Sequence, residues 1–267
     1  MCVNCDSTRR GLMRLALGGV AAGLIAPRRL RAADIHIQPL IMLDPGHGGM
    51  DPGAIAPDGV EEKHITLSSA LELRKTLEAT GRYRVAMTRV HDVFIPLQDR
   101  VSDAVAQSAS LFLAMHCDHL PTPELRGASV FTLSNDASDA LSASLAQDEN
   151  GGGFGDGAAG GTSPQVADIL ASLETRATKI GSQSLARDIQ ASFRGVVPLL
   201  PDPHRSANFA VLRDPSTPAT LLEMGCLTNP LDEKRLRSPK HRALMAERIT
   251  LAINEYFDNY AYRRMAG

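Results

Sequence analysis

The first half of the chain alternates between short apolar runs and segments with helical periodicity. The runs IMLDP, YRVAMT and SLFLAM start at residues 41, 83 and 110. Between them, residues 65–80 space their leucines along one helix face, and residues 97–108 are amphipathic. Short apolar runs predict buried strands, whereas a spacing of three to four predicts helices. Strands and helices that alternate in this way are typical of a parallel sheet with crossover helices.

The second half continues this pattern around one glycine-rich segment. Residues 151–162 contain seven glycines in twelve residues, which predicts a flexible loop. Residues 134–180 lack the periodicity for a core of their own, so we expect an insertion in a single α/β domain. The remaining expected strands are 126–133, 207–212 and 219–224, and the expected helices are 138–147, 165–173, 177–193, 230–236 and 240–260.

The N-terminus has the composition of an export signal. Thr8-Arg9-Arg10 is a twin-arginine n-region, a short apolar stretch follows, and Ala32-Ala33 offers a cleavage site. We therefore expect residues 1–32 to be a signal peptide and residues 33–267 to work in the periplasm, exported already folded. The apolar stretch is too short to span a bilayer comfortably, although an N-terminal anchor is the alternative.

Removal of residues 1–32 leaves an acidic protein. Six arginines and one aspartate are lost, so the formal charge goes from −2 to −7. This charge argues against nucleic acid or an anionic membrane as the main partner. Cys117 and Cys226 are then the remaining cysteines, too few for a disulfide scaffold. Buried free thiols are the first interpretation, and a single bridge is the alternative in an oxidising compartment.

Three predicted strands end at or near residues of types that can bind metals or transfer protons. His47 lies in the turn DPGHGG, His116 follows SLFLAM, and Glu223 ends the last strand. A polar cluster, EEKH at residues 61–64, enters the first helix. Zinc takes imidazole nitrogens and carboxylate oxygens, and a catalytic site keeps one position open. The separations between these residues along the chain match no local metal-binding motif, so spacing alone is weak evidence for a zinc site.

Several ordered motifs resemble one family. DPGHGGMDPGA, VEEK, FLAMHCDH, RGASVFTLS and LLEMGCLTNP together are similar to the zinc N-acetylmuramoyl-L-alanine amidases, over about residues 40–257. The resemblance implies a six-stranded sheet with helices on both sides, and one zinc ion held by His47, Glu62 and His116. The family's acidic catalytic position falls on Glu223. This residue can accept a proton from water and pass it to the departing L-alanine nitrogen.

The resemblance also implies regulation by the insertion. In the division-associated branch of the family, a helix in this position covers the active site with a glutamate on the zinc until an activator displaces it. Here Glu149 is the first candidate for the blocking carboxylate, with Glu174 or Asp168 behind it. Such a gate needs two states that differ by only a few kcal/mol. A surface loop without any regulatory role is the alternative.

Some neighbouring residues stay open as alternatives. Glu61 competes with Glu62 as a ligand, and His119 competes with His116. Asp118 is placed to hydrogen-bond a ligand histidine. Arg89 and Arg100 could hold a substrate carboxylate or form structural salt bridges.

The expected function is hydrolysis of the amide bond between N-acetylmuramic acid and L-alanine in peptidoglycan, during wall remodelling and daughter-cell separation. The protein is expected to act as a monomer without a stable membrane span after cleavage, together with an activator protein. A zinc peptidase that cuts stem peptides is one alternative. A non-catalytic wall-binding or activator protein is the other.

Overall fold

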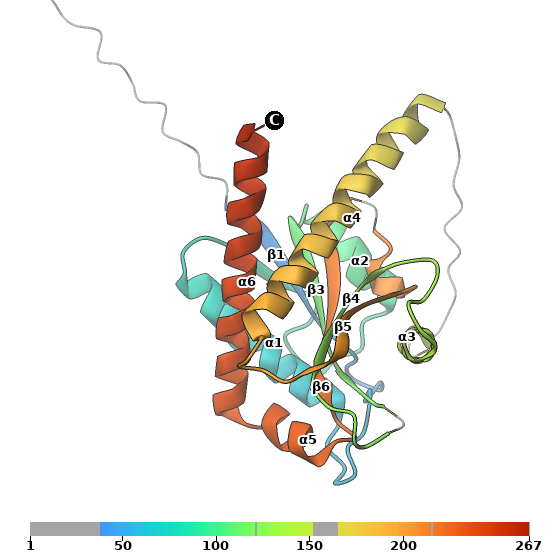
Figure 1. Cartoon of the computed structure of the whole chain (residues 1–267), viewed down its shortest axis with the longest axis vertical. Helices are drawn as coiled ribbons and strands as arrows, with labels where there is room; N and C mark the ends of the chain where they lie inside the picture. The colour runs from blue at the N-terminus through green and yellow to red at the C-terminus, as the bar shows by residue number, and fades with distance from the viewer. Residues whose placement is uncertain (1–37, 121, 152–164, 215, 267) are drawn as a thin grey trace, which may run out of the picture. The chain divides into compact units, whose positions relative to one another are not determined.

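The computed structural model describes residues 38–120, 122–151, 165–214 and 216–266, with side chains from residue 176 in the third range and to residue 259 in the fourth (Figure 1). Its strands are β1 (Leu40–Pro45), β2 (Arg84–Met87), β3 (Leu111–Asp118), β4 (Ala128–Leu133), β5 (Leu199–Ala207) and β6 (Ala219–Cys226). Its helices are α1 (Glu62–Ala79), α2 (Leu97–Ala106), α3 (Ala140–Gly151), α4 (Gln165–Phe193), α5 (Pro230–Leu236), α6 (Pro239–Ala266) and the 3-10 helix η1 (Ala210–Leu212).

The described residues form one six-stranded sheet in the order β2-β1-β3-β6-β4-β5. Neighbouring strands are parallel except that β4 runs antiparallel to β6. Every residue of β1, β3 and β6 is buried. Central strands covered on both faces have few polar positions, which is why the apolar runs predict them well. The expected mostly parallel α/β sheet is confirmed.

Helices cover both faces of this sheet. One core contains α1, α4 and α6, with Leu73, Ile189 and Ile253 at 0% exposure. The opposite core contains α2, η1 and α3, which contributes Leu145 and Ala146. Figure 1 shows α4 and α6 crossing one face and α3 lying apart from them. No described helix combines the length and apolar character needed to cross a membrane.

Alternation along the strands decides which core each end residue faces. Phe112 and Ala114 of β3 lie in the core beneath α3, as does Leu221 of β6. Side chains two residues apart share a face of a sheet. His116 and Glu223 therefore continue on the α3 side, and they are directly paired across β3 and β6.

Two sequence expectations about the second half are wrong. Residues 207–212 are not a strand, because β5 ends at Ala207 and η1 follows; β5 itself was not expected. Its prolines, Pro201 and Pro203, remove ladder donors, which only an edge strand tolerates. Residues 165–173 and 177–193 form one helix, α4, so the expected insertion 134–180 ends inside a helix whose later turns lie in the core.

The first helix starts three residues earlier than its leucine pattern indicates. It begins at Glu62, whose backbone N–H donates to the Ala54 carbonyl at 2.8 Å. A carboxylate in the first turn is favoured by the positive end of the helix dipole. The fold thus places the Glu62 side chain at the carboxyl edge of the sheet.

Candidate metal centre

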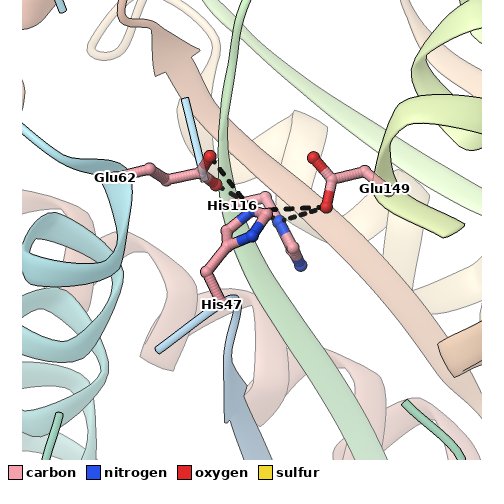
Figure 2. Close-up of side chains that lie close together, drawn as sticks. All are labelled: His47, Glu62, His116 and Glu149. Carbon is pink, nitrogen blue, oxygen red and sulfur yellow. Dashed lines mark ion pairs between the residues drawn. The ribbon is translucent and has the colours of Figure 1, made fainter. Parts of the chain in front are cut away.

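Four side chains from distant parts of the chain meet at the carboxyl edge of the sheet. His47, Glu62, His116 and Glu149 each offer one ligand atom, and these atoms all lie within 4.8 Å of one another. Figure 2 shows them converging from the turn after β1, the start of α1, the end of β3 and the last turn of α3. The fold therefore unites residues that are separated by 102 positions between His47 and Glu149.

The carboxylates bracket the two imidazoles. Glu62 places Oε2 3.1 Å from His47 Nε2 and Oε1 3.2 Å from His116 Nδ1. Glu149 places a single atom, Oε2, 3.4 Å from His47 Nε2 and 3.0 Å from His116 Nδ1. The two rings stand edge-on, with centroids 4.9 Å apart and an angle of 78°.

The donor atoms fit a metal ion. His47 Nε2 and His116 Nδ1 are buried and have no hydrogen-bond partner among the described residues, although carboxylate oxygens lie nearby. Buried polar atoms left without partners cost about 1 to 3 kcal/mol each. Two imidazole nitrogens and two carboxylates directed at one point satisfy this demand if a cation lies between them, and this donor set suits zinc.

Charge within the cluster leads to the same interpretation. Burial disfavours the protonated form of His116, but Glu149 and Glu62 outweigh it and raise its pKa to about 9. Burial raises the pKa of Glu62, but His47 and His116 outweigh it and bring that pKa to about 2. The cluster therefore demands positive charge at its centre, which protons supply in the absence of a metal.

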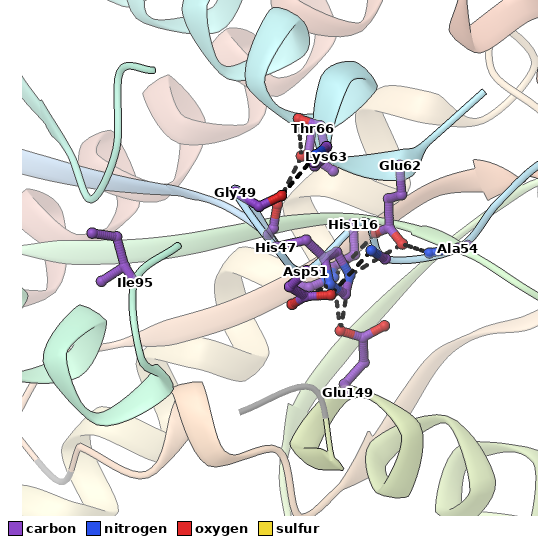
Figure 3. A network of polar contacts seen from close by, with 12 residues as sticks. His47, Gly49, Asp51, Ala54, Glu62, Lys63, Thr66, Ile95, His116 and Glu149 are labelled. Carbon is purple, nitrogen blue, oxygen red and sulfur yellow. Dashed lines mark hydrogen bonds and ion pairs between the residues drawn. The ribbon is translucent and has the colours of Figure 1, made fainter. Parts of the chain in front are cut away.

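Surrounding groups fix the ligand atoms in place. His47 Nδ1 lies 2.9 Å from Asp51 Oδ2, which leaves Nε2 as the nitrogen directed at the cluster. Glu62 accepts a backbone N–H bond from Ala54 at 2.9 Å (Figure 3). It accepts a second one from Cys117 at 2.8 Å. Asp51 was missed from the sequence; its position four residues after His47 in HGGMD was the available signal.

Two glycines leave the space that the ligands occupy. A Cβ on Gly46 would lie 2.3 Å from His116 Cε1. A Cβ on Gly53 would lie 2.5 Å from His47 Cδ2 and 2.6 Å from Glu62 Oε2. Real Cβ atoms do not approach so closely, so larger residues at either position would push a ligand away.

Two buried arginines hold the turn that carries His47. Arg100 donates to the carbonyls of Pro45 at 3.0 Å and His47 at 2.9 Å, and to Asp44 Oδ1 at 2.7 Å. Arg89 donates to the carbonyls of Pro45 at 2.9 Å and Gly46 at 2.8 Å. Their guanidinium groups therefore bind the protein's own backbone. These contacts also hold His47 at a φ of 60°, a conformation that few non-glycine residues adopt.

Glu223 lies beside the cluster, and its carboxylate has no partner among the described residues. It is 0% exposed, and neither carboxylate oxygen has a hydrogen-bond partner among the described residues. Burial, followed by the charges of Asp118, Glu149 and Glu62, raises the pKa of Glu223 well above its usual value. The structure thus places next to His116 a buried carboxyl group whose affinity for a proton is raised by burial and by the neighbouring carboxylates.

Comparison with known proteins identifies the fold's relatives. The family model described as N-acetylmuramoyl-L-alanine amidase matches residues 41–255. The chain belongs to the N-acetylmuramoyl-L-alanine amidase family. It is 38% identical to the amidase AmiC of Neisseria meningitidis over 228 residues, which cover 85% of this chain and 55% of that protein. It is 35% identical to AmiA of Salmonella typhimurium over 263 residues, 93% and 90% of the two chains.

A solved structure agrees with this assignment. The crystal structure of N-acetylmuramoyl-L-alanine amidase from Clostridium difficile 630 matches with a TM-score of 0.62 at 25% identity, covering 82% of this chain and 97% of that one. The chain spans about half the length of the Neisseria relative and most of the Salmonella one. The resemblance seen in the motifs is confirmed, and with it the enzyme class, a hydrolase of the peptidoglycan amidase type.

The residues that were alternatives to the expected ligands, or were expected to support them, lie outside the cluster. Glu61, the rival of Glu62, pairs instead with Lys63 at 3.2 Å and His64 at 3.3 Å. His119 is exposed beyond β3. Asp118 was expected to hydrogen-bond a ligand histidine, but its Oδ1 has no hydrogen-bond partner among the described residues. Asp51 has that contact instead.

Some of the other expected positions lie outside the described residues, whereas the two cysteines lie within them. Glu174 and Asp168 lie outside the residues whose side chains are described, as does the whole signal segment 1–32. Cys117 and Cys226 are buried free thiols. Burial and the nearby carboxylate of Glu62 raise the pKa of Cys117 well above its usual value, which disfavours the thiolate that a metal would need.

Proposed function

We propose that this protein is a zinc hydrolase that cleaves the amide bond between the lactyl group of N-acetylmuramic acid and L-alanine. The observation that carries the proposal is the convergence of His47, Glu62 and His116 on one point, with unpartnered imidazole nitrogens. Membership of the amidase family supports the bond that is cleaved. Zinc in this site would supply Lewis acidity toward the amide carbonyl.

The protein's own residues position the metal and move the protons. Asp51 orients His47, and the N–H groups of Ala54 and Cys117 orient Glu62. Glu223 takes a proton from the attacking water as the new C–O bond forms. It then gives that proton to the L-alanine nitrogen as the C–N bond breaks, so the products are a free acid and a free amine.

Digestion of purified sacculi by the zinc-loaded Glu149→Gln variant, which lacks the blocking carboxylate proposed below, tests this function. An amidase releases intact stem peptides that begin with free L-alanine, as mass spectrometry would show. A chelator should abolish release and zinc should restore it. Fragments cut within the stem would support the peptidase alternative, and binding without any release by a zinc-loaded protein would support the wall-binding alternative.

Substitution of Glu223 tests its role separately. Glu223→Gln keeps the shape but cannot accept a proton, so zinc content should stay near one per chain while turnover falls at least 100-fold, the scale of acid–base catalysis. Elemental analysis and the sacculus assay measure the two quantities. Both quantities are measured in the active Glu149→Gln background, where turnover near that of the parent with Glu223 intact would refute the assignment.

We further propose that α3 holds the enzyme inactive through Glu149. A catalytic zinc site needs one open position, and a fourth protein ligand would fill it. Glu149 Oε2 lies within 3.4 Å of both histidines, and its side chain is only 15% exposed. Removal of this carboxylate should therefore raise basal activity without an activator.

The matched control is the neighbouring residue on the same helix. Asp148 is exposed and has no ion pair among the described residues. Glu149→Gln should raise basal hydrolysis at least tenfold, the scale of one charge-assisted contact, whereas Asp148→Asn should leave it unchanged. Equal activity in the two variants would contradict gating by Glu149.

The cellular setting is part of the same proposal. We place the enzyme in the periplasm, exported through a twin-arginine signal at residues 1–32, where it splits peptidoglycan during daughter-cell separation. An activator protein that displaces α3 would switch it on. Replacement of Arg9 and Arg10 by lysine should leave the protein in the cytoplasm, as cell fractionation would detect.

A further inference from the structure

Arg205 lies on the same face of the sheet as the metal cluster, next to the start of α3. On β5 it pairs with Phe131 of β4, which in turn pairs with Leu221 of β6. Phe131 and Leu221 belong to the core beneath α3, so the row extends that face outward to Arg205. Glu223 is two residues beyond Leu221 on the same face.

The guanidinium of Arg205 is mostly buried, and no carboxylate of the described residues lies within hydrogen-bond distance of it. Its side chain is 12% exposed. Nε donates to the Asp202 carbonyl at 3.1 Å and Nη2 to the Pro201 carbonyl at 3.3 Å, and both acceptors are neutral. Nη1 lies 3.7 Å from Asp139 Oδ1, beyond hydrogen-bond distance. A buried cation usually has a closer counter-charge than this.

That distant carboxylate belongs to the segment proposed to move. Asp139 precedes α3 and accepts the Ser142 N–H at 2.8 Å, so it caps the helix and would leave with it. Movement of α3 would take Asp139 away from this guanidinium, which has no other carboxylate partner among the described residues.

We propose that Arg205 binds a carboxylate of the peptidoglycan stem peptide when α3 is displaced. Arginine presents paired N–H donors that match a carboxylate, and the stem carries such a group on the residue after L-alanine. The inference rests on the amidase function and the gate proposed above. Arg205 would be a substrate-binding residue that selects acidic stems over amidated ones.

A pair of substrates that differ in one group tests this inference. N-acetylmuramoyl-L-alanyl-D-glutamate has the carboxylate, whereas its D-isoglutamine counterpart has a carboxamide there. In the Glu149→Gln background, we expect higher kcat/KM for the acid. Addition of Arg205→Gln should lower kcat/KM for the acid at least tenfold, mostly through KM, and change that for the amide less than threefold.

Two controls separate substrate binding from the contact with α3. Asp139→Asn keeps a helix cap but removes the charge that faces Arg205, so it should preserve the ratio of acid to amide. Arg82→Gln removes an arginine that pairs with Asp258 far along the chain, and should also preserve it. Arg205→Lys should give an intermediate ratio of acid to amide, because a single ammonium charge replaces the paired N–H donors of the guanidinium.

An unchanged ratio in Arg205→Gln would overturn the inference, including the case in which both substrates slow equally. Failure of the Glu149→Gln parent to release L-alanine peptides from either substrate or from sacculi would instead refute the amidase function, and the inference would fall with it. The two failures are therefore distinguishable.

Discussion

Gly53 gives a sharp test of how the turn makes room for the metal ligands. It has a φ of 65°, and an added Cβ would lie 2.5 Å from His47 Cδ2 and 2.6 Å from Glu62 Oε2. Gly53→Ala should therefore do two things. It should strain the backbone by about 1 to 2 kcal/mol, because L-residues disfavour positive φ, and it should push both ligands out of position.

Gly59 is a matched control in the same loop. Its φ is 88°, and an added Cβ would meet nothing within 4 Å. Gly59→Ala should thus lower stability by a similar amount of about 1 to 2 kcal/mol and leave the cluster intact. The difference between the two variants isolates the steric effect on the ligands.

The expected difference lies in zinc affinity. Changes that disturb ligand orientation typically weaken metal binding about 10- to 100-fold, so Gly53→Ala should bind zinc that much more weakly than Gly59→Ala. Competition with a chromophoric chelator measures the affinity, and urea unfolding of the zinc-free proteins measures the strain. Equal zinc affinity in the two variants would refute the view that Gly53 clears space for the ligands.

Three further predictions concern charge and pH. Arg100→Met should cost about 3 to 5 kcal/mol in urea unfolding, because it leaves the buried carboxylate of Asp44 without its cationic partner, with the Thr88 hydroxyl still donating to it. A loss below about 1 kcal/mol would contradict this. Burial raises the pKa of Tyr83 to about 12, above its unfolded value of 10, and its hydroxyl donates to Asn254. The free energy of unfolding should therefore fall as pH rises from 10 to 12. Tyr83→Phe should make that fall smaller. Because His116 has a pKa of about 9 without metal, zinc binding should release protons and weaken as pH falls, and calorimetry in buffers of different ionisation enthalpy should detect the release.

The sequence alone determined the elements whose signal is local. Continuous apolar runs indicated β1, β3 and β6 because strands covered on both faces tolerate few polar residues. The same signal failed for β5, because this strand is not a continuous apolar run. It lies at the edge of the sheet, where Pro201 and Pro203 are tolerated although they lack N–H groups for pairing. The division of α4 into two helices failed as well, because loss of periodicity does not break a helix that lacks proline.

The motifs also named residues that the tertiary structure brought together. His47, Glu62, His116 and Glu149 were singled out from motifs and family resemblance, yet only the fold shows that their ligand atoms meet within 4.8 Å. Such convergence depends on strand order and on the packing of α3, and neither is encoded in the spacing along the chain.

Contacts that hold the site in place were decided by the tertiary structure. The sequence left Arg100 open between substrate binding and a salt bridge, and its contacts with Asp44 and with the Pro45 and His47 carbonyls are visible only after folding. Local apolar patterning determined which strands are buried, because burial depends on the side chains of each segment. The partners of buried polar groups were decided by the fold, because each partner comes from a different segment of the chain.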